Sequence, residues 1–104
     1  METTVITFDI TSSFENWVNA YDESLPKQEE FGLVSLYRGH EKDDPTKCIV
    51  IGSAGEGALD KFMEANAEMI AASGHVMEST VLKTYLSKEA AKINAFTSAH
   101  WGPT

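Results

Sequence analysis

Three histidines are the side chains of this chain best suited to acid–base chemistry near neutral pH. His40, His75 and His100 are widely separated, and none has a second histidine four positions away, so no helical metal pair is present. For each of them, an ordinary strand-end or surface histidine is the competing interpretation. The sequence therefore predicts no metal site, although it offers His40 and His75 as candidates for contact with a ligand.

Arg38 is the only arginine, and it stands two residues before His40. In an extended strand these two side chains share one face, whereas Tyr37 points to the other. A fixed cation next to a histidine could orient the polar end of a ligand. The alternative is a plain ion pair with a nearby carboxylate such as that of Asp43 or Asp44.

Aromatic side chains supply the apolar part of the predicted site. Trp17 and Tyr21 lie one turn apart on a predicted helix, and Phe62 and Met63 lie on a second one, so together they could line a cavity for a flat apolar ligand. Core packing is the alternative use of such a stripe. The side chains predicted to bind a small, mostly apolar molecule in the cleft between helices and sheet are Trp17, Tyr21, Arg38, His40, His75 and Tyr85.

Other motifs favour structure over chemistry. Cys48 is the single cysteine and lies within a predicted strand, so it is expected to be a small buried hydrophobic residue without a disulfide. The glycines at 52, 55 and 57 match neither the dinucleotide fingerprint nor a P-loop, and they are expected to form a turn. No EF-hand spacing and no nucleophile motif occurs, and no cofactor is predicted.

The charge balance restricts the partners. With 16 acidic and 8 basic residues among 104, the net charge is −8, which disfavours nucleic acid and anionic membranes. The amino terminus lacks a basic region, and no apolar stretch is long enough to span a bilayer. We therefore expect a cytoplasmic protein with one folded domain.

Hydrophobic periodicity predicts strands at about residues 3–10, 33–40, 47–53 and 78–87. Helices are predicted from 14 to 25, started by a capping box of Ser12 and Glu15 and ended or kinked by Pro26, and over about 59–70, stopped by Gly74. A polar connection of residues 27–30 follows Pro26, and the link of residues 41–46 predicts a hairpin. In the first strand, the even-numbered residues are assigned to the core.

This order of elements is the ferredoxin-like βαββαβ pattern of an α+β fold, with a four-stranded antiparallel sheet and two helices on one face. The predicted domain covers residues 1–87. Residues 88–104 are expected to form a C-terminal tail, which begins with helix formers and is either frayed or packed on a partner subunit.

The predicted strands carry apolar residues on both faces, whereas an antiparallel sheet with one solvated face alternates apolar with polar residues. Two helices cover only one face, so a second copy of the chain is the expected cover of the other, giving a homodimer through the sheet faces. Because strands two and four are apolar on both sides, the sequence leaves open which of their faces meets the partner.

With this order and length, the chain resembles the dimeric α+β barrel superfamily, which includes the antibiotic-monooxygenase-like proteins. The segments 13–17, 36–45 and 74–80 are also similar to a small group of uncharacterised marine microbial proteins of this fold. The resemblance covers about residues 1–87. It implies a dimer of facing sheets, but it selects no reaction, because the superfamily also includes haem-degrading monooxygenases, chlorite dismutase relatives and stress-induced proteins.

Three functional hypotheses follow. The first is a homodimer that binds a small apolar molecule in the helix–sheet cleft. The second is a cofactor-independent monooxygenase-like enzyme that holds an aromatic substrate there, with His40 or His75 assisting proton transfer. The third is a structural or regulatory dimer without a ligand.

Overall fold

The computed structural model describes residues 2–86. Strand β1 (Glu2–Ile10) is followed by helix α1 (Phe14–Glu30), by the strands β2 (Val34–Glu41) and β3 (Asp44–Ala54), by the short helices α2 (Ala58–Ala65) and α3 (Ala67–Ala72), and by strand β4 (His75–Leu86). The C-terminal tail predicted for residues 88–104, including His100, lies outside the described residues. Within residues 2–86, no helix combines the length and the apolar content needed to cross a membrane.

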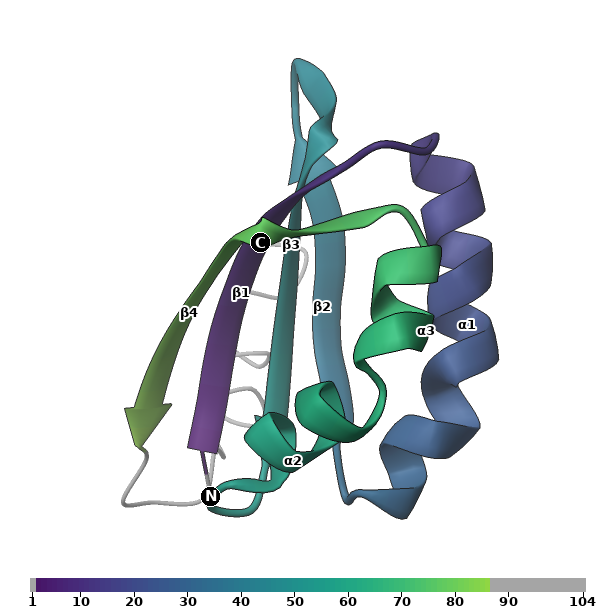
Figure 1. Cartoon of the computed structure of the whole chain (residues 1–104). Helices are drawn as coiled ribbons and strands as arrows, with labels where there is room; N and C mark the ends of the chain where they lie inside the picture. The colour runs from purple at the N-terminus through teal and green to yellow at the C-terminus, as the bar shows by residue number, and fades with distance from the viewer. Residues whose placement is uncertain (1, 87–104) are drawn as a thin grey trace, which may run out of the picture.

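The four strands form one antiparallel sheet in the order β2-β3-β1-β4. The helices α1, α2 and α3 all lie on the same side of this sheet, with β4 at the edge farthest from α1 (Figure 1). The predicted ferredoxin-like α+β fold is confirmed, including the antiparallel hairpin of β2 and β3. The link in that hairpin is shorter than expected, because β3 already begins at Asp44.

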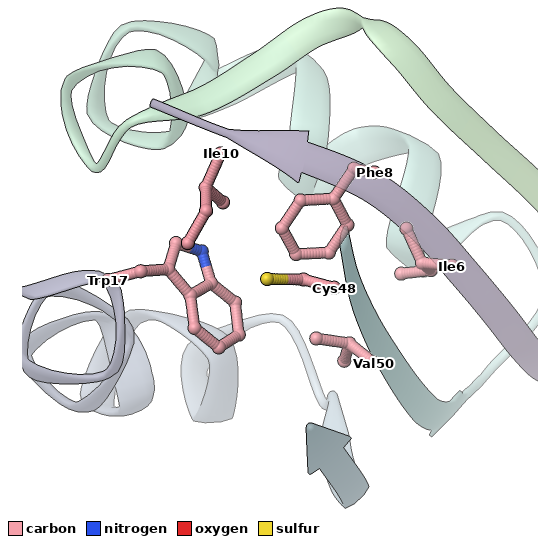
Figure 2. Packing of buried hydrophobic residues seen from close by; sticks show 6 residues of the cluster. All are labelled: Ile6, Phe8, Ile10, Trp17, Cys48 and Val50. Carbon is pink, nitrogen blue, oxygen red and sulfur yellow. The ribbon is translucent and has the colours of Figure 1, made fainter. Parts of the chain in front are cut away.

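Buried and more exposed side chains alternate along β1, and the buried ones belong to the core. Its even-numbered residues Thr4, Ile6, Phe8 and Ile10 are buried, as predicted, while Val5 and Asp9 are only half-buried and Thr7 is exposed. The side chains that surround Trp17 in the main hydrophobic cluster come from β1 and β3, and Figure 2 shows them with Trp17: Ile6, Phe8, Ile10, Cys48 and Val50. The fold therefore depends on one sheet face packing against α1.

Cys48 behaves as the sequence predicts. The side chain is buried in this cluster and forms no disulfide. Burial, assisted by the negative charges of Asp9 and Asp44, raises the pKa of its thiol to about 11. The residue therefore serves as a small apolar side chain, because the reactive thiolate is disfavoured.

Helix α1 begins one residue later than the predicted capping box. Ser13 is the N-cap, and its Oγ accepts a hydrogen bond from the backbone N–H of Asn16 at 3.1 Å. Ser12 lies outside the helix and donates to the backbone oxygen of Ser73 at 3.3 Å. The capping box of Ser12 and Glu15 was thus wrong, because Ser12 ties the start of α1 to the end of α3.

The prediction that α1 ends at Pro26 and gives way to a polar connection is also wrong, because the helix continues to Glu30. Proline removes one backbone hydrogen bond, but Pro26 lies on the exposed side of the helix. The turn after it is held by Gln28, whose buried side chain bonds both Ser24 and Ser35. These tertiary contacts offset the local effect of proline.

The second predicted helix is present as two short segments, α2 and α3, which meet at Asn66. Both the backbone N–H and the side-chain Nδ2 of Asn66 donate to the carbonyl of Phe62, each at 3.0 Å. Asparagine competes in this way with continued helix formation. At the start of α2, Gly57 adopts a φ of 74°, so the glycine-rich stretch forms a turn, as predicted.

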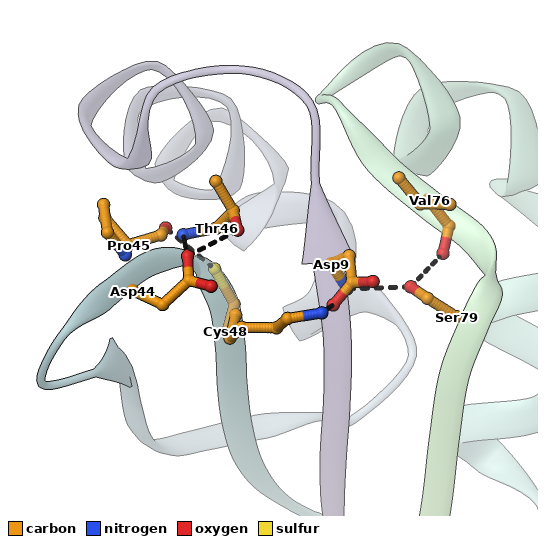
Figure 3. A network of polar contacts seen from close by, with 8 residues as sticks. Asp9, Asp44, Pro45, Thr46, Cys48, Val76 and Ser79 are labelled. Atoms are coloured by element: carbon orange, nitrogen blue, oxygen red, sulfur yellow. Dashed lines mark hydrogen bonds and ion pairs between the residues drawn. The ribbon is translucent and has the colours of Figure 1, made fainter.

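Strand β4 begins at His75, three residues before the predicted start. Its pairing with β1 contains an irregularity between Thr7 and Asp9. Ser79 fills this irregularity, since its Oγ accepts from the backbone N–H of Asp9 at 2.7 Å and donates to the backbone oxygen of Val76 at 2.6 Å (Figure 3). The extra length of β4 therefore depends on a serine side chain that replaces a missing ladder contact.

The sheet face opposite the helices carries an apolar surface, which we call the outer patch. The register places its members on all four strands, and those on β2 and β4 are the most exposed, with exposed fractions of 57% for Tyr37, 50% for Val81 and 56% for Tyr85. The outer patch consists of Val5, Tyr37, Ile49, Ile51, Val81 and Tyr85. The sheet thus presents apolar residues on both faces.

We expect Gly74→Ala to lower the free energy of unfolding by about 2 kcal/mol. Gly74 has a φ of 96°, and a Cβ there would lie 2.6 Å from Ser12 Oγ and 3.2 Å from Ser12 N. Urea denaturation measures the change. Gly55→Ala is the matched control, because Gly55 has open space around its Cα and no positive φ. Equal stability of the two variants would contradict this account of the turn.

Candidate functional site

A cavity of about 110 Å³ lies between the helices and the sheet. Its walls are mostly apolar. They are formed by Ile6, Phe8, Trp17, Val50, Leu59, Phe62, Met63, Met69 and Ile70. An engineered apolar cavity of about 150 Å³ admits benzene, so a volume of this order suits a molecule with a single ring or a short chain.

Small residues on β3 keep this cavity open. The helix-facing positions of the strand are Cys48, Val50, Gly52 and Ala54, so the last two carry no side chain or only a methyl group. Gly52 pairs with Thr4 on one side and with Ser35 on the other, and a Cβ there would lie 3.4 Å from the backbone oxygen of Val34. The missing side chain leaves space that the helices do not fill.

Four polar residues that line the cavity form a continuous chain of hydrogen bonds. Tyr21 Oη is hydrogen-bonded to Ser35 Oγ, and Ser35 Oγ donates to Gln28 Oε1 at 3.1 Å. Gln28 Nε2 donates to Ser24 Oγ at 2.9 Å, and Ser24 Oγ donates to the backbone oxygen of Tyr21 at 2.6 Å. We call these residues the polar chain. It joins α1 to β2 and gives the mostly apolar cavity a wall of polar side chains that are hydrogen-bonded to one another.

Two predicted site residues, Trp17 and Tyr21, line the cavity. Trp17 is 3% exposed and contacts the rings of Phe8 and Tyr21, with centroids 5.4 and 5.1 Å apart. Trp17 therefore belongs both to the core and to the cavity wall, so the two uses considered for the aromatic stripe occur together. The predicted helix-two residues Phe62 and Met63 also line the cavity.

His75 lines the same cavity, and it is buried with only 8% of its surface exposed. Its ring stacks on Phe8 with centroids 4.0 Å apart and planes 9° from parallel, and Nε2 lies 2.6 Å from Thr80 Oγ1. Burial lowers the pKa of this imidazole below its ordinary value. Among the described residues, no hydrogen bond joins His75 to Tyr21 or to Glu2, the other titratable side chains of the lining.

Arg38 and His40 share one face of β2, as predicted, and this face is the one toward the helices, but neither residue lines the cavity. Arg38 pairs with Asp22 at 2.5 Å instead of Asp43 or Asp44, because the helix-facing side of β2 meets α1. Its guanidinium carbon lies 5.3 Å from the centroid of the Tyr21 ring. Arg38 can thus hold Tyr21 in place without reaching a molecule inside.

His40 lies near the start of α1. Its ring packs edge-on against Phe14 with centroids 4.6 Å apart, and Nδ1 lies 2.7 Å from the backbone oxygen of Glu41. The structure therefore does not bring His40 and His75 together at one site.

Tyr85 lies on the other side of the sheet. It pairs with Thr3, an odd-numbered residue of β1, so it belongs to the outer patch and does not face the helix–sheet cleft. His75 and Tyr85 would share one face of β4 if its alternation were unbroken, because successive side chains point to opposite faces. The irregularity between Thr7 and Asp9 changes the register, so His75 pairs with Ile10 and faces the helices whereas Tyr85 faces outward.

Ser24, Gln28, Ser35 and Gly52 contribute to the cavity but were not predicted. The helical spacing of Trp17, Tyr21, Ser24 and Gln28 was the available signal for two of them, because i, i+4, i+7 and i+11 share one helical face. This spacing was not used because Pro26 was expected to end the helix before Gln28. Within residues 2–86, no group of three histidine, cysteine or acidic side chains is placed to hold a metal ion.

The sequence profile of one family, described as Domain of unknown function (DUF3764), matches residues 1–87. A search of curated proteins finds no match.

Solved structures of similar fold do exist. One is SnoaB, a cofactor-independent oxygenase from Streptomyces nogalater, with a TM-score of 0.64, 11% identity and coverage of 86% of this chain and 95% of SnoaB. A conserved protein from Methanosarcina mazei Go1 has a TM-score of 0.62 at 15% identity, and the match covers 84% of this chain and 92% of that protein's chain. An antibiotic biosynthesis monooxygenase has a TM-score of 0.61 at 14% identity, covering 86% and 100%. At these identities the likeness shows a shared fold.

We expect the free energy of unfolding to fall as the pH drops below about 6.5, the ordinary pKa of histidine. His75 resists protonation in the folded state, so below that pH the unfolded chain binds more protons and is favoured. Urea denaturation between pH 7.5 and 5 measures this slope.

His75→Gln should flatten the slope, whereas the control His40→Gln should retain it. A slope that is unchanged in His75→Gln would assign the pH dependence to other groups.

Proposed function

Because the chain belongs to the family described as Domain of unknown function (DUF3764), we propose its function from its own cavity: it binds one small, mostly apolar molecule between the helices and the sheet. The observation that carries this proposal is a cavity with mostly aromatic and aliphatic walls and a few polar groups, the combination typical of small-molecule sites. Trp17 and Phe62 provide apolar contact area, while the polar chain orients one end of the ligand.

The charges of the lining limit the ligand. Glu2 is the only acidic side chain among the lining residues, and none of them is a lysine or an arginine. An anion buried there would lack a paired cation, which is costly in an apolar environment. The proposal is therefore a neutral molecule.

The second part of the proposal is a homodimer through the outer patch. Exposed apolar residues gathered on one sheet face are typical of a protein–protein contact, and one cation, Lys83, lies within the outer patch between Val81 and Tyr85. All helices of the described chain lie on the other sheet face, so a second copy is the self-complementary cover that the residues suggest. The likeness to the dimeric α+β barrel superfamily supports the same arrangement.

A second candidate function is that of a cofactor-independent oxygenase that acts on an aromatic molecule in the same cavity. It is favoured by the fold shared with SnoaB and by the buried imidazole of His75 in the cavity wall. This candidate differs from pure binding because it requires oxygen uptake and an oxygenated product.

We expect toluene to bind the protein and to shift the backbone NMR resonances of cavity residues such as Trp17 and Phe62. Gly52→Val should weaken this binding at least about tenfold, because the added methyl groups occupy cavity space. Gly55→Val is the matched control, since it adds the same groups in open space. If toluene shifts no cavity resonance in the unaltered protein, the binding proposal is wrong.

We expect size-exclusion chromatography with light scattering to give a mass of twice 11.4 kDa at micromolar concentration. Val81→Lys should shift the protein toward the monomer, because it buries a charge in the proposed interface. Leu25→Lys is the control, since Leu25 is an exposed apolar residue on α1, away from the outer patch. A stable monomer of the unaltered chain would overturn the dimer.

A further inference from the structure

We propose that the cavity selects its ligand by the direction of hydrogen bonding: it prefers a neutral hydroxyl group, which donates a proton, to a carbonyl group, which only accepts. This inference rests on the proposed function, because it names the chemical class of the molecule bound at that site. It follows from the order of donors and acceptors in the polar chain.

The order is fixed at Ser24. Ser24 Oγ donates its only proton to the backbone oxygen of Tyr21 at 2.6 Å, and a backbone oxygen can only accept. Ser24 Oγ must therefore accept from Gln28, which requires the amide nitrogen of Gln28 to face it at 2.9 Å. This contact sets the orientation of the amide, which its shape alone does not determine.

The same reasoning extends to the other end of the polar chain. The amide oxygen of Gln28 faces Ser35 at 3.1 Å and can only accept, so Ser35 donates its only proton there. Ser35 Oγ must then accept the proton of Tyr21. Each hydroxyl proton in the chain is therefore committed to the next member.

What remains for a ligand is a set of acceptors. Tyr21 Oη and Ser35 Oγ keep free lone pairs, and these two residues are the more accessible members of the chain. Within the polar chain, the one uncommitted donor is the second amide proton of Gln28, whose side chain is buried. Donation along a chain also strengthens the acceptor at its start, so Tyr21 Oη is the preferred partner for a ligand hydroxyl.

The test compares three single-ring probes by NMR titration: phenol, benzaldehyde and toluene. In the unaltered protein, we expect phenol to bind about fivefold more tightly than benzaldehyde, as one additional hydrogen bond predicts. Equal or tighter binding of benzaldehyde overturns the proposed direction. If none of the probes, including toluene, shifts cavity resonances, the proposed function itself fails.

Ser35→Ala gives a second, independent readout. Without Ser35 Oγ, the Tyr21 hydroxyl proton is released, so benzaldehyde should bind about fivefold more tightly relative to toluene than in the unaltered protein. Ser73→Ala is the matched control, because Ser73 also lines the cavity but donates to Ile70 within α3. If the ratio of benzaldehyde affinity to toluene affinity is unchanged in Ser35→Ala, the proposed direction of hydrogen bonding in the polar chain is wrong.

Discussion

The pairing of β1 with β3 is the constraint on which the rest of the structure depends. It sets Ile6 opposite Val50 and Phe8 opposite Cys48, so the same parity on both strands faces the helices. A slip by one residue would turn over one of the two strands, so that either Val5 or Ile51 would face α1 in place of a present core residue. The same register places Gly52 beside Thr4, where the cavity opens. Core, cavity and outer patch are therefore three consequences of one alignment.

Much of the fold follows from local patterns, because alternation and helical spacing report which face of each element is apolar. The even face of β1, the stripe on α1 and the hairpin were predictable for this reason. The ends of the helices and strands were less predictable, because contacts between residues far apart in the sequence determine them. Pro26 lies within α1 since Gln28 is anchored to β2, and β4 starts at His75 since Ser79 supplies a contact to Asp9. Neither partner is adjacent in the sequence.

The residues of the cavity wall could be predicted where they share one helical stripe, as Trp17 and Tyr21 do. His75, which was also predicted, lines the cavity from the start of β4. Tyr85 was placed in the cleft although it faces outward, because β4 carries apolar residues on both faces and its register with β1 is not encoded locally. Gly52 and Ser35 were missed for a related reason. A glycine contributes to a cavity through the side chain it lacks, which becomes visible only once Thr4 and Ser35 are known to flank it.

The likeness to solved structures of oxygenases is a likeness of fold. A four-stranded sheet covered by helices on one side leaves a cleft in many sequences, since it needs only an alternating apolar pattern, and that pattern survives at 11–15% identity. The proposed ligand depends instead on a few positions that the pattern does not constrain. In this chain, Gly52 provides the volume, and Gln28 aligns the protons of Ser35 and Tyr21. The proposed selectivity of the cavity is therefore a property of these side chains and can differ among proteins that share the sheet.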